Sequence, residues 1–509
     1  MLHDLLDNTT KRRIKLLETM LFYDRWIASS DLAKICNTSS RTINNDLQYL
    51  RSNYPEFFTI ETSKQHGVRL KSTNYFRLEQ FYRHLINEDS IFQLMEGIFL
   101  HPQIHNQTWI ETLYLSTSSF YRLYKRIQSA LEDYDIYLDY GYCSKNEIAL
   151  RYFFSNFFAE KYGYNDWPFA IDRNEITNHI KDVASYIQNK YFKNDDYYIL
   201  DSQQILHLAM LIAVCTIRIK QGHHFKDFKK QHQSEEIPHL FYEQAKHIFR
   251  PIFDTISLED YEEIYYSIFA FTTAWNNEEE FVHINREIAK FIQNIADESN
   301  IPISKTEMTR IRYMMLNKYS SYKVFSYEEE LIFNRDDFIG HLIFENYPDL
   351  FQFLVNDLDQ LAEKTSYPWL KDMAEIIFNM IVKWPALTQL FSQNYPKLKA
   401  ILISDLGGDH QEYLKRTINH IFSNYLDIES YPYDVFHLKE RMQSLKEQYD
   451  LIILSFNYDE ILGEEKTLSI NPILNDLDFK NINRCIQNFY EEKDLTIPKL
   501  YADSLMNKE

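Results

Sequence analysis

Apolar residues recur at helical spacing through the first fifty residues, where polar turns divide them into three short segments. In the third segment, Ile43, Leu47 and Leu50 stand at i, i+4 and i+7 and form one inward face of a helix. The run Asn37-Thr38-Ser39-Ser40 before it supplies a turn and a helix cap. The predicted helices are Lys11 to Phe22, Asp31 to Cys36 and Arg41 to Arg51. Their lengths and the tight turn indicate a helix-turn-helix unit.

The outward face of the third helix carries arginine, hydroxyl and amide side chains. Side chains of this kind on one helical face suit the base edges and phosphates of DNA. The DNA contacts expected here are Ser40, Arg41, Thr42, Asn44, Asn45, Gln48 and Arg51. Two β segments follow, Phe57 to Glu61 and Gly67 to Lys71, and the polar loop between them contains Lys64. We therefore expect a winged unit whose basic tip, at Lys64, lies along the DNA backbone.

The same order of helix, helix, turn and helix returns downstream. Apolar positions predict helices over Ser90 to Phe99, Trp109 to Tyr114 and Ser119 to Leu131. The last of these turns cations and a tyrosine outward, as expected for phosphate and base contact, although a solvated charged helix has the same pattern. The contacts expected here are Ser118, Tyr121, Arg122, Lys125 and Arg126. A second wing is expected through Tyr134 to Leu138 and Glu147 to Leu150.

The net charge of −20 by itself argues against nucleic-acid binding, but this charge is unevenly distributed along the chain. Residues 1–131 hold 16 Lys and Arg against 13 Asp and Glu, while the remaining residues hold 38 against 61. Phosphate affinity depends on the charge at the contact surface, so an acidic body behind a slightly basic front is compatible with DNA binding.

The positions of the cysteines and the lengths of the apolar runs limit the kinds of protein that this chain can be. Cys36, Cys143, Cys215 and Cys485 lie far apart, without the spacing of a zinc site or a disulfide framework. No signal peptide and no uncharged apolar run long enough for a membrane span is visible. The 9 glycines and 13 prolines leave little linker. We expect a soluble, cytoplasmic, mainly α protein that needs no cofactor and no metal.

From about residue 170 to 395, long amphipathic helices alternate with short polar breaks. Their density fits two consecutive helical bundles. The helices expected include Ile176 to Phe192, Gln203 to Lys220, Glu236 to Phe249, Leu258 to Thr273, Glu280 to Glu298, Lys305 to Asn317, Asp336 to Phe344 and Leu370 to Val382.

The pattern changes at Leu398 to strands and helices in alternation. The expected elements are a strand over Leu398 to Ile403, a helix to about Asn424, a strand over Asp427 to Tyr433, a helix over Val435 to Glu447 and a strand over Asp450 to Ser455. This βαβαβ order requires a parallel sheet with right-handed crossovers. Gly407-Gly408 before a helix is compatible with phosphate binding, but two glycines alone are weak support for it.

Three segments carry a resemblance to a known family. They are Ser39-Ser40-Arg41-Thr42-Ile43-Asn44-Asn45-Asp46-Leu47, Leu115-Ser116-Thr117-Ser118-Ser119-Phe120-Tyr121-Arg122 and Glu147-Ile148-Ala149-Leu150-Arg151-Tyr152-Phe153. In that order and spacing the chain resembles the Mga/AtxA family of Gram-positive virulence regulators, including its RofA-like members. Lys145 and Asn146 stand where many members have a glycine, which is a minor departure.

The resemblance implies five domains. They are a winged helix-turn-helix at 1–75, an Mga-type helix-turn-helix at 76–168, PRD-like helical bundles at 169–284 and 285–395, and an EIIB-like α/β domain at 396–509. In relatives, PTS-regulation domains (PRDs) are phosphorylated on histidine by the sugar phosphotransferase system. The resemblance also implies a homodimer that responds to carbohydrate supply through transient contact with phosphocarrier proteins.

Histidines of the two bundles are the candidate phosphorylation sites. Arg218 and Gly222 match the tail of an antiterminator-type PRD motif, but the histidine position of that motif falls on Leu211. His207 lies one helical turn earlier, and His223 follows the same helix. His341 lies in a segment that resembles the surroundings of a PRD histidine. A lone histidine on an apolar face is more often a hydrogen-bonded core residue, so both interpretations stay open for His207, His223 and His341.

The function expected is DNA-binding transcriptional regulation, with activation of virulence or surface-protein genes. No GxSxG, HExxH or Walker loop is present, so an enzyme is not expected. A PRD-containing RNA-binding antiterminator is the nearest alternative, but such proteins begin with a strand-rich RNA domain. A phosphotransferase-system carrier protein is the second alternative. An active EIIB domain has a cysteine in the loop after its first strand, but the loop after Leu398 to Ile403 has no cysteine.

Overall fold

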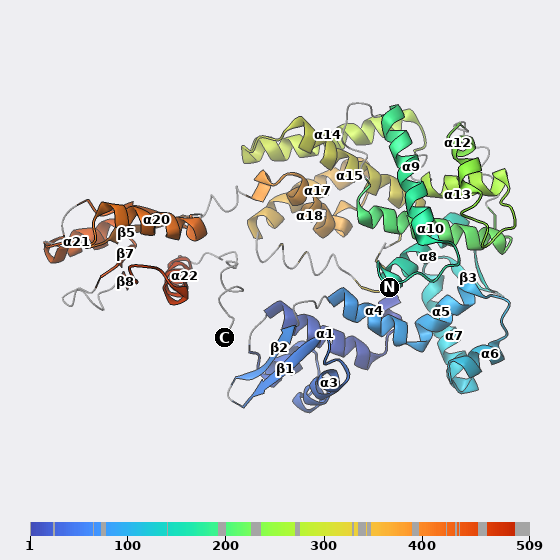
Figure 1. Cartoon of the computed structure of the whole chain (residues 1–509), viewed down its shortest axis with the longest axis horizontal. Coiled ribbons are helices and arrows are strands. Elements are labelled where there is room, and N and C mark those ends of the chain that lie inside the picture. Colours follow the sequence, from blue (N-terminus) through green and yellow to red (C-terminus); the bar gives the residue numbers. More distant parts are fainter. Residues whose placement is uncertain are drawn as a thin grey trace. The chain divides into compact units, whose positions relative to one another are not determined.

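The computed structural model describes residues 2–23, 26–64, 66–72, 78–139, 141–191, 200–224, 236–269, 275–327, 330–333, 340, 343, 348–388, 396–423, 425–432, 435–436, 438–456 and 466–493. It forms two compact units. The first comprises Met1–Val282 with Leu316–Arg335, and the second comprises His283–Met315 with Asp336–Glu509. Helices dominate both units, and the expectation of a mainly α chain with two helix-turn-helix domains and a small α/β domain is confirmed (Figure 1).

A winged helix-turn-helix opens the first unit, and we call it the first winged unit. Its elements are α1 (Asn8–Tyr23), α2 (Ser29–Ile35), α3 (Ser40–Asn53), β1 (Phe58–Ser63) and β2 (Gly67–Ser72). Ser39 caps α3 by accepting the Thr42 N–H at 3.1 Å. Ile43, Leu47 and Leu50 are buried as the periodicity predicts. The strands β1 and β2 pair antiparallel, and the backbone of Ile27 bridges to Val68.

Gly67 is required where β2 begins. Its φ of 97° lies in the left-handed region, and a Cβ there would lie 2.2 Å from the carbonyl oxygen of Ile27. The hairpin therefore packs against the entry to α2 because position 67 has no side chain.

The second winged unit begins at α4 (Leu78–Glu88). It continues with α5 (Ser90–Leu100), α6 (Asn106–Thr112), α7 (Thr117–Glu132), β3 (Ile136–Leu138) and β4 (Tyr142–Ser144). The prediction for its second wing strand is wrong, because Glu147 to Leu150 begin helix α8 (Glu147–Tyr162) instead. The side chain of Asn146 accepts the Ala149 N–H at 3.2 Å, and this cap starts the helix directly after β4.

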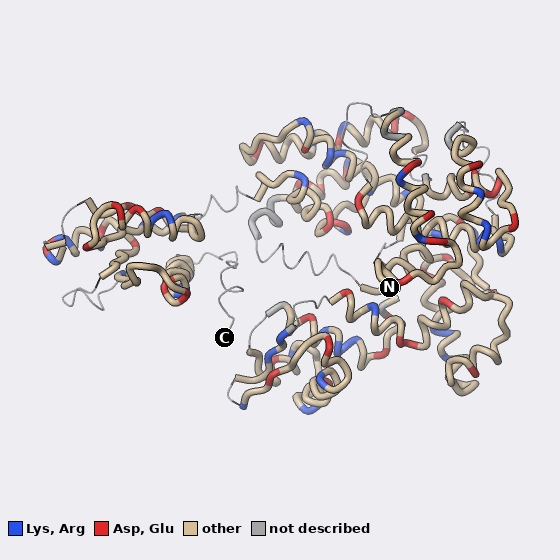
Figure 2. Tube along the Cα trace, viewed as in Figure 1, with Lys and Arg blue, Asp and Glu red and all other residues tan. Residues whose placement is uncertain are grey.

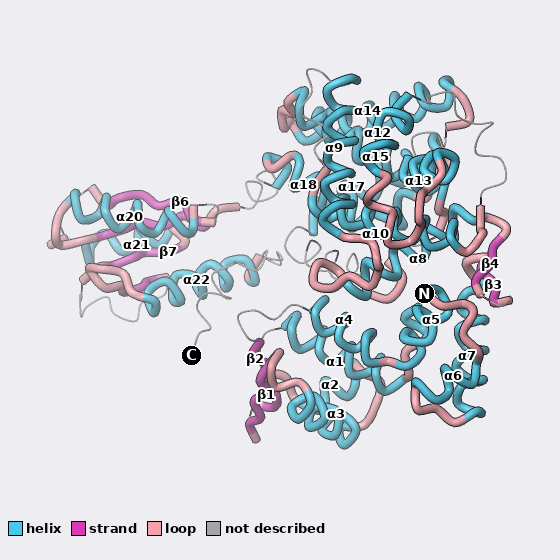
Figure 3. The backbone as a smooth tube through the Cα atoms, turned by 45° about the vertical axis from the view of Figure 1, so that its right-hand side comes forward, coloured by secondary structure: helices cyan, strands magenta, loops and turns pink. Residues whose placement is uncertain are grey.

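Helix α8 is buried on nearly every side, and its buried residues include apolar and charged side chains. Phe153, Phe154, Phe157 and Phe158 are all fully buried. Arg151 and Lys161 of the same helix are buried too, so neighbouring elements cover α8 almost all round. It packs against α10 (Ser202–Lys220), and the two helices lie side by side in Figures 1 and 3.

The first helical bundle consists of α9 (Arg173–Tyr191), α10, α12 (Glu236–Ala245) and α13 (Leu258–Phe269). One side of α10 belongs to the core of the winged units, and its other side packs in a separate core with α9 and α13. Among the described helices, α10 alone is long and apolar enough to cross a membrane, but 61% of its apolar window is buried in the protein.

A segment from much later in the chain completes the first unit, and we call residues 325–327 and 330–333 the strap. Its Leu331 and Ile332 are buried in the core of the winged units. The carboxylate of Glu160 on α8 accepts the backbone N–H groups of Leu331, Ile332 and Phe333 at 2.5 to 3.0 Å. The ring of Phe333 packs on Tyr82, with centroids 4.2 Å apart.

The second unit contains further helices and a parallel sheet. Only residues 283–299 of α14 (Glu278–Ser299) and residues 305–315 of α15 (Lys305–Val324) belong to this unit. It also contains the whole of α17 (Pro348–Thr365) and α18 (Met373–Lys383). Sequence analysis did not predict α17. Most of the helix expected over Asp336 to Phe344 lies outside the described residues.

The sheet has the order β6-β5-β7-β8, all parallel. Its strands are β5 (Leu398–Ile403), β6 (Leu426–Ser430), β7 (Leu451–Leu454) and β8 (Thr467–Ser469), with helices α20 (Gly408–Phe422), α21 (Leu438–Gln448) and α22 (Asp476–Glu491). The predicted βαβαβ order is confirmed, and β8 with α22 extends it.

Candidate nucleic-acid interface and its link to the first bundle

Helix α3 is held against α1 by a buried carboxylate. Asp46 is 2% exposed and accepts from Arg12 Nε at 2.6 Å and from Arg13 Nε at 3.0 Å. The guanidinium of Arg13 also stacks on the Tyr49 ring, 3.4 Å from its centroid. Sequence analysis missed this role of Asp46, although its place between the inward-facing Ile43 and Leu47 was a signal. The pairing fixes the angle at which α3 presents its other face.

The predicted contact face of α3 is open. Its exposed members are Ser40, Arg41, Asn44, Asn45, Gln48 and Arg51. Thr42 is half-buried, and its hydroxyl lies 2.9 Å from that of Ser39, so it contributes to the cap. Lys64 is exposed at the end of β1, where the hairpin turns.

On α7 the predicted contacts divide into two groups. Ser118, Tyr121, Arg122 and Lys125 are exposed. Arg126 is half-buried, and its Nη2 donates to the carbonyl oxygen of Leu5 at 2.5 Å. That bond holds the short helix η1 (Leu2–Leu5) against α7 and gives Arg126 a structural role.

Both charge signs occur along the helices of the winged units (Figure 2). The buried carboxylate of Asp46 is paired with Arg12 and Arg13, whereas Arg41 and Arg51 of α3 lie at the surface. A weakly basic front can therefore present locally positive faces.

Tyr82 on α4 connects the first winged unit to the strap. Its hydroxyl donates to Glu18 Oε1 on α1 at 2.6 Å, and its ring contacts Phe333. The two winged units and the strap thus share one side chain.

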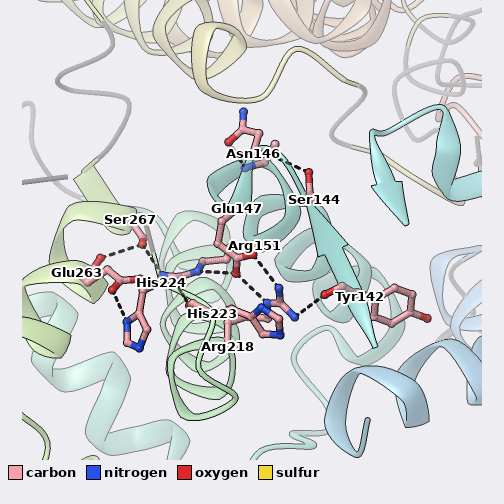
Figure 4. Close-up of polar contacts among 11 residues, drawn as sticks. Tyr142, Ser144, Asn146, Glu147, Arg151, Arg218, His223, His224, Glu263 and Ser267 are labelled. Carbon is pink, nitrogen blue, oxygen red and sulfur yellow. Dashed lines mark hydrogen bonds and ion pairs between the residues drawn. The ribbon is translucent and has the colours of Figure 1, made fainter. Parts of the chain in front are cut away.

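A buried charge network joins the second winged unit to the first bundle (Figure 4). Arg218 near the end of α10 donates from Nε and Nη2 to the two oxygens of Glu147 at 2.8 and 2.7 Å. Its Nη1 donates to the backbone oxygen of Tyr142 on β4 at 2.9 Å. Arg151, fully buried one turn along α8, also donates to Glu147, at 3.2 Å.

The other end of Arg151 reaches α13. Its Nη2 donates to Glu263 Oε1 at 2.5 Å and to the backbone oxygen of His223 at 2.9 Å, and its Nη1 donates to Ser267 at 3.2 Å. His224 Nδ1 lies 2.9 Å from the second oxygen of Glu263. Two arginines and two glutamates are therefore paired in a nearly dry setting, where removing one partner is costly.

Sequence analysis named Glu147 and Arg151 for their resemblance to the family motif but did not predict this network. A usable signal was the presence of arginines at apolar positions of α8 and α10, because buried charges occur almost always in pairs.

The predicted phosphorylation sites lie in different settings. His207 is half-buried on α10. His223 is half-buried just after α10, and burial, with the positive charge of Arg218 next in weight, lowers the pKa of its imidazole. His341 lies outside the described residues. Within the described part of the chain, no group of three or more His, Cys, Asp or Glu is arranged to hold a metal ion.

Comparison with known families finds matches at the two winged units. Residues 9–66 match the M protein trans-acting positive regulator (MGA) HTH domain, and residues 74–158 match the Mga helix-turn-helix domain. The second match takes in α8 with Glu147 and Arg151.

Two similar proteins match most of the chain, and a third matches less than half of it. A putative trans-acting regulator of Streptococcus pneumoniae is 22% identical over 489 residues, which cover 89% of this chain and 93% of that protein. The capsule synthesis positive regulator AcpA of Bacillus anthracis is 21% identical over 454 residues, 83% of this chain and 88% of that protein. AcpB of the same organism, also named a capsule synthesis positive regulator, is 21% identical over 221 residues, 43% of this chain and 44% of that protein.

Proposed function

From the membership of this chain in the Mga/AtxA family of DNA-binding transcriptional regulators, we propose that it activates virulence or surface-protein genes. The proposed contacts with double-stranded DNA are made by α3, the β1–β2 hairpin and α7. The observation that carries the proposal is the exposed face of α3, with arginine and amide side chains beside a hairpin that has Lys64 at its turn. A recognition helix of this composition fits the major groove, and a wing fits the adjacent backbone.

Mapping of bound sites across the genome tests the proposal, followed by gel-shift assays on the sites found. The double variant R41A/N44A should bind those sites at least about 30-fold more weakly, because two base contacts of about 1–3 kcal/mol each sum to about 2–6 kcal/mol. K34A is the matched control, since Lys34 is an exposed cation on α2 outside the proposed face. Unchanged affinity of R41A/N44A removes α3 from the proposed interface.

Positive regulation is proposed because two of the similar proteins are named capsule synthesis positive regulators. Deleting the gene should lower transcripts adjacent to the mapped sites, and restoring it should raise them again. A rise on deletion would indicate a repressor. If the sites found were in RNA, the antiterminator alternative would take its place.

We propose further that phosphorylation of a bundle histidine tunes this activity, with His207, His223 and His341 as the candidates. His223 is supported by two arginines nearby: Arg151 donates to its backbone oxygen, and Arg218, after burial, helps to lower the pKa of its imidazole. An added phosphoryl group would compete with Glu147 and Glu263 for these arginines. Ala and Asp variants at the true site should shift reporter output in opposite directions. Purified phosphocarrier proteins should label the wild type and not the matching Ala variant. If all three Ala variants are labelled and regulate as wild type does, the bundles are scaffolds.

Homodimerisation through the second unit is also part of the proposal. Exposed apolar side chains occur in its α/β domain, including Leu406, Phe436, Ile473 and Leu477. Deleting residues 396–509 should reduce the mass measured by light scattering from that of a dimer. An unchanged mass would assign the contact to the helical bundles.

A further inference from the structure

The turns of the two helix-turn-helix units have the same hydrogen bonds. In the first winged unit the Thr38 N–H donates to the carbonyl oxygen of Ala33 at 2.9 Å. In the second, where α6 and α7 flank the turn (Figures 1 and 3), the Leu115 N–H donates to the carbonyl oxygen of Ile110, also at 2.9 Å. Each bond reaches back five residues, as in the Schellman motif that ends many helices. The two turns therefore place the same demand on the residue at their centre.

That central residue has to adopt the left-handed backbone conformation. It is Asn37 in the first turn, with a φ of 48°, and Tyr114 in the second, with a φ of 53°. Glycine adopts this conformation without strain, and asparagine is the next most common residue at this point of the motif. The Cβ of other residues crowds a neighbouring carbonyl oxygen there, so the backbone at Tyr114 is strained.

The side chain of Tyr114 gains no contact that would offset this strain. It is 96% exposed, and neither its ring nor its hydroxyl has a partner among the residues that the structure describes. Strained residues persist where their side chain serves a function. A contact with a molecule outside the chain is therefore the physical reason for a tyrosine at this position.

The position of the turn indicates which molecule this is. Tyr114 lies two residues before Ser116, whose hydroxyl caps α7 by accepting the Ser119 N–H at 3.1 Å. Ser118, a predicted DNA contact, is exposed in the first turn of the same helix. The start of a helix attracts phosphate groups, and tyrosine hydroxyls are among the usual donors to DNA phosphates.

We propose that Tyr114 is a DNA-contact residue whose hydroxyl donates to a phosphate oxygen of the duplex beside the start of α7. A phosphate contact positions the second winged unit on the duplex and does not itself read the base sequence. The inference rests on the proposed DNA contact of α7 and adds to it a residue that precedes the helix.

The main test is the variant Y114N, which gives the second turn the residue that the first turn has. The full-length variant should bind a duplex with a mapped site and a random-sequence duplex of equal length about tenfold more weakly, as expected for one lost hydrogen bond to a charged group. The slope of log affinity against log salt should not change, because a phenol carries no charge. The melting temperature should rise by about 2 °C, since asparagine relieves the strain.

Three further variants separate the hydroxyl, the strain and a general loss of affinity. Y114F keeps the ring and the strained backbone, so it should lose as much affinity as Y114N at an unchanged melting temperature. Y164F removes the hydroxyl of another exposed tyrosine, in the loop after α8, and should bind as wild type does. N37Y puts a tyrosine in the first turn and should lower the melting temperature.

The comparison with the variant R122A/K125A distinguishes this inference from the proposed function. Wild-type affinity of Y114N and Y114F, with weakened binding by R122A/K125A, would overturn the inference and keep α7 on DNA. Wild-type affinity of R122A/K125A would refute the proposed contact of α7, and this inference with it. Weakened binding by Y114N but not by Y114F would overturn the hydrogen bond to phosphate. Unchanged melting temperatures of both Y114N and N37Y would overturn the strain on which the inference rests.

Discussion

Arg218 and Glu147 form two parallel N–H···O contacts of 2.8 and 2.7 Å across the junction of α10 and α8. Glu147 is the first residue of α8, so this bond ties the start of the helix that follows the second wing to the end of a bundle helix. Arg218 also holds the backbone of β4 through Tyr142. The orientation of the second wing is therefore coupled to the first bundle through one guanidinium.

We expect E147A to destabilise the first unit by about 3–5 kcal/mol, because it leaves Arg151 and Arg218 buried with one carboxylate fewer. Urea unfolding followed by circular dichroism measures the change. D31A is the control, since the Asp31–Lys34 pair is exposed and should contribute less than about 1 kcal/mol. If E147A lowered the free energy of unfolding no more than D31A does, Arg151 and Arg218 would have to be solvated.

Gly97 on α5 should not tolerate a methyl group. A Cβ there would lie 2.3 Å from the Trp109 ring of α6, so G97A should cost about 1–3 kcal/mol through overpacking. G408A is the matched control because nothing lies within 4 Å of a Cβ at that position and its φ is not in the left-handed region. Thermal unfolding of the two variants compares them directly, and equal melting temperatures would refute the close packing.

Docking of the strap should weaken as pH rises. Burial raises the pKa of Glu160 to about 7, against the opposing effect of the strap amides. The folded state then holds a proton that the unfolded state releases at its ordinary, lower pKa, so stability is fully present below about pH 4.5 and is lost as pH rises through 7. The loss should be about 1–3 kcal/mol.

Urea midpoints at pH 5 and pH 8 measure this effect. E160Q keeps an oxygen acceptor for the strap amides and cannot ionise, so the difference between its two midpoints should be smaller than in the wild type. Equal pH dependence in the two proteins would show that Glu160 does not titrate in this window.

Salt dependence distinguishes a phosphate contact from a structural arginine on α7. R122A/K125A should reduce the slope of log affinity against log salt by about two, if each contacts one phosphate. R126A should leave the slope unchanged and lower the melting temperature, because it releases the carbonyl of Leu5. The opposite result would place Arg126 on DNA and Arg122 and Lys125 in solvent.

Local patterns predicted those parts of the fold that local forces determine. The cap at Ser39, the inward face of α3 and the strand Leu398–Ile403 all follow from neighbours within a few residues. Glu147 to Leu150 were expected to form the second wing, whereas the Asn146 side chain starts a helix there. The partner of Arg151, Glu263, lies 112 positions away, and no periodicity reports a contact at that distance.

The strap has a consequence for biosynthesis. Glu160 leaves the ribosome about 170 residues before the strap amides that bind its carboxylate. The interval between the synthesis of Tyr82 and that of its partner Phe333 is longer still. Since synthesis is vectorial and domains generally fold as they emerge, the two winged units must persist for that time with an uncovered apolar surface. A nascent chain or a product of premature termination before residue 331 would carry both helix-turn-helix domains and still lack Leu331 and Ile332 of their core. Such a fragment should be a substrate for chaperones and proteases rather than a competitor for operator sites.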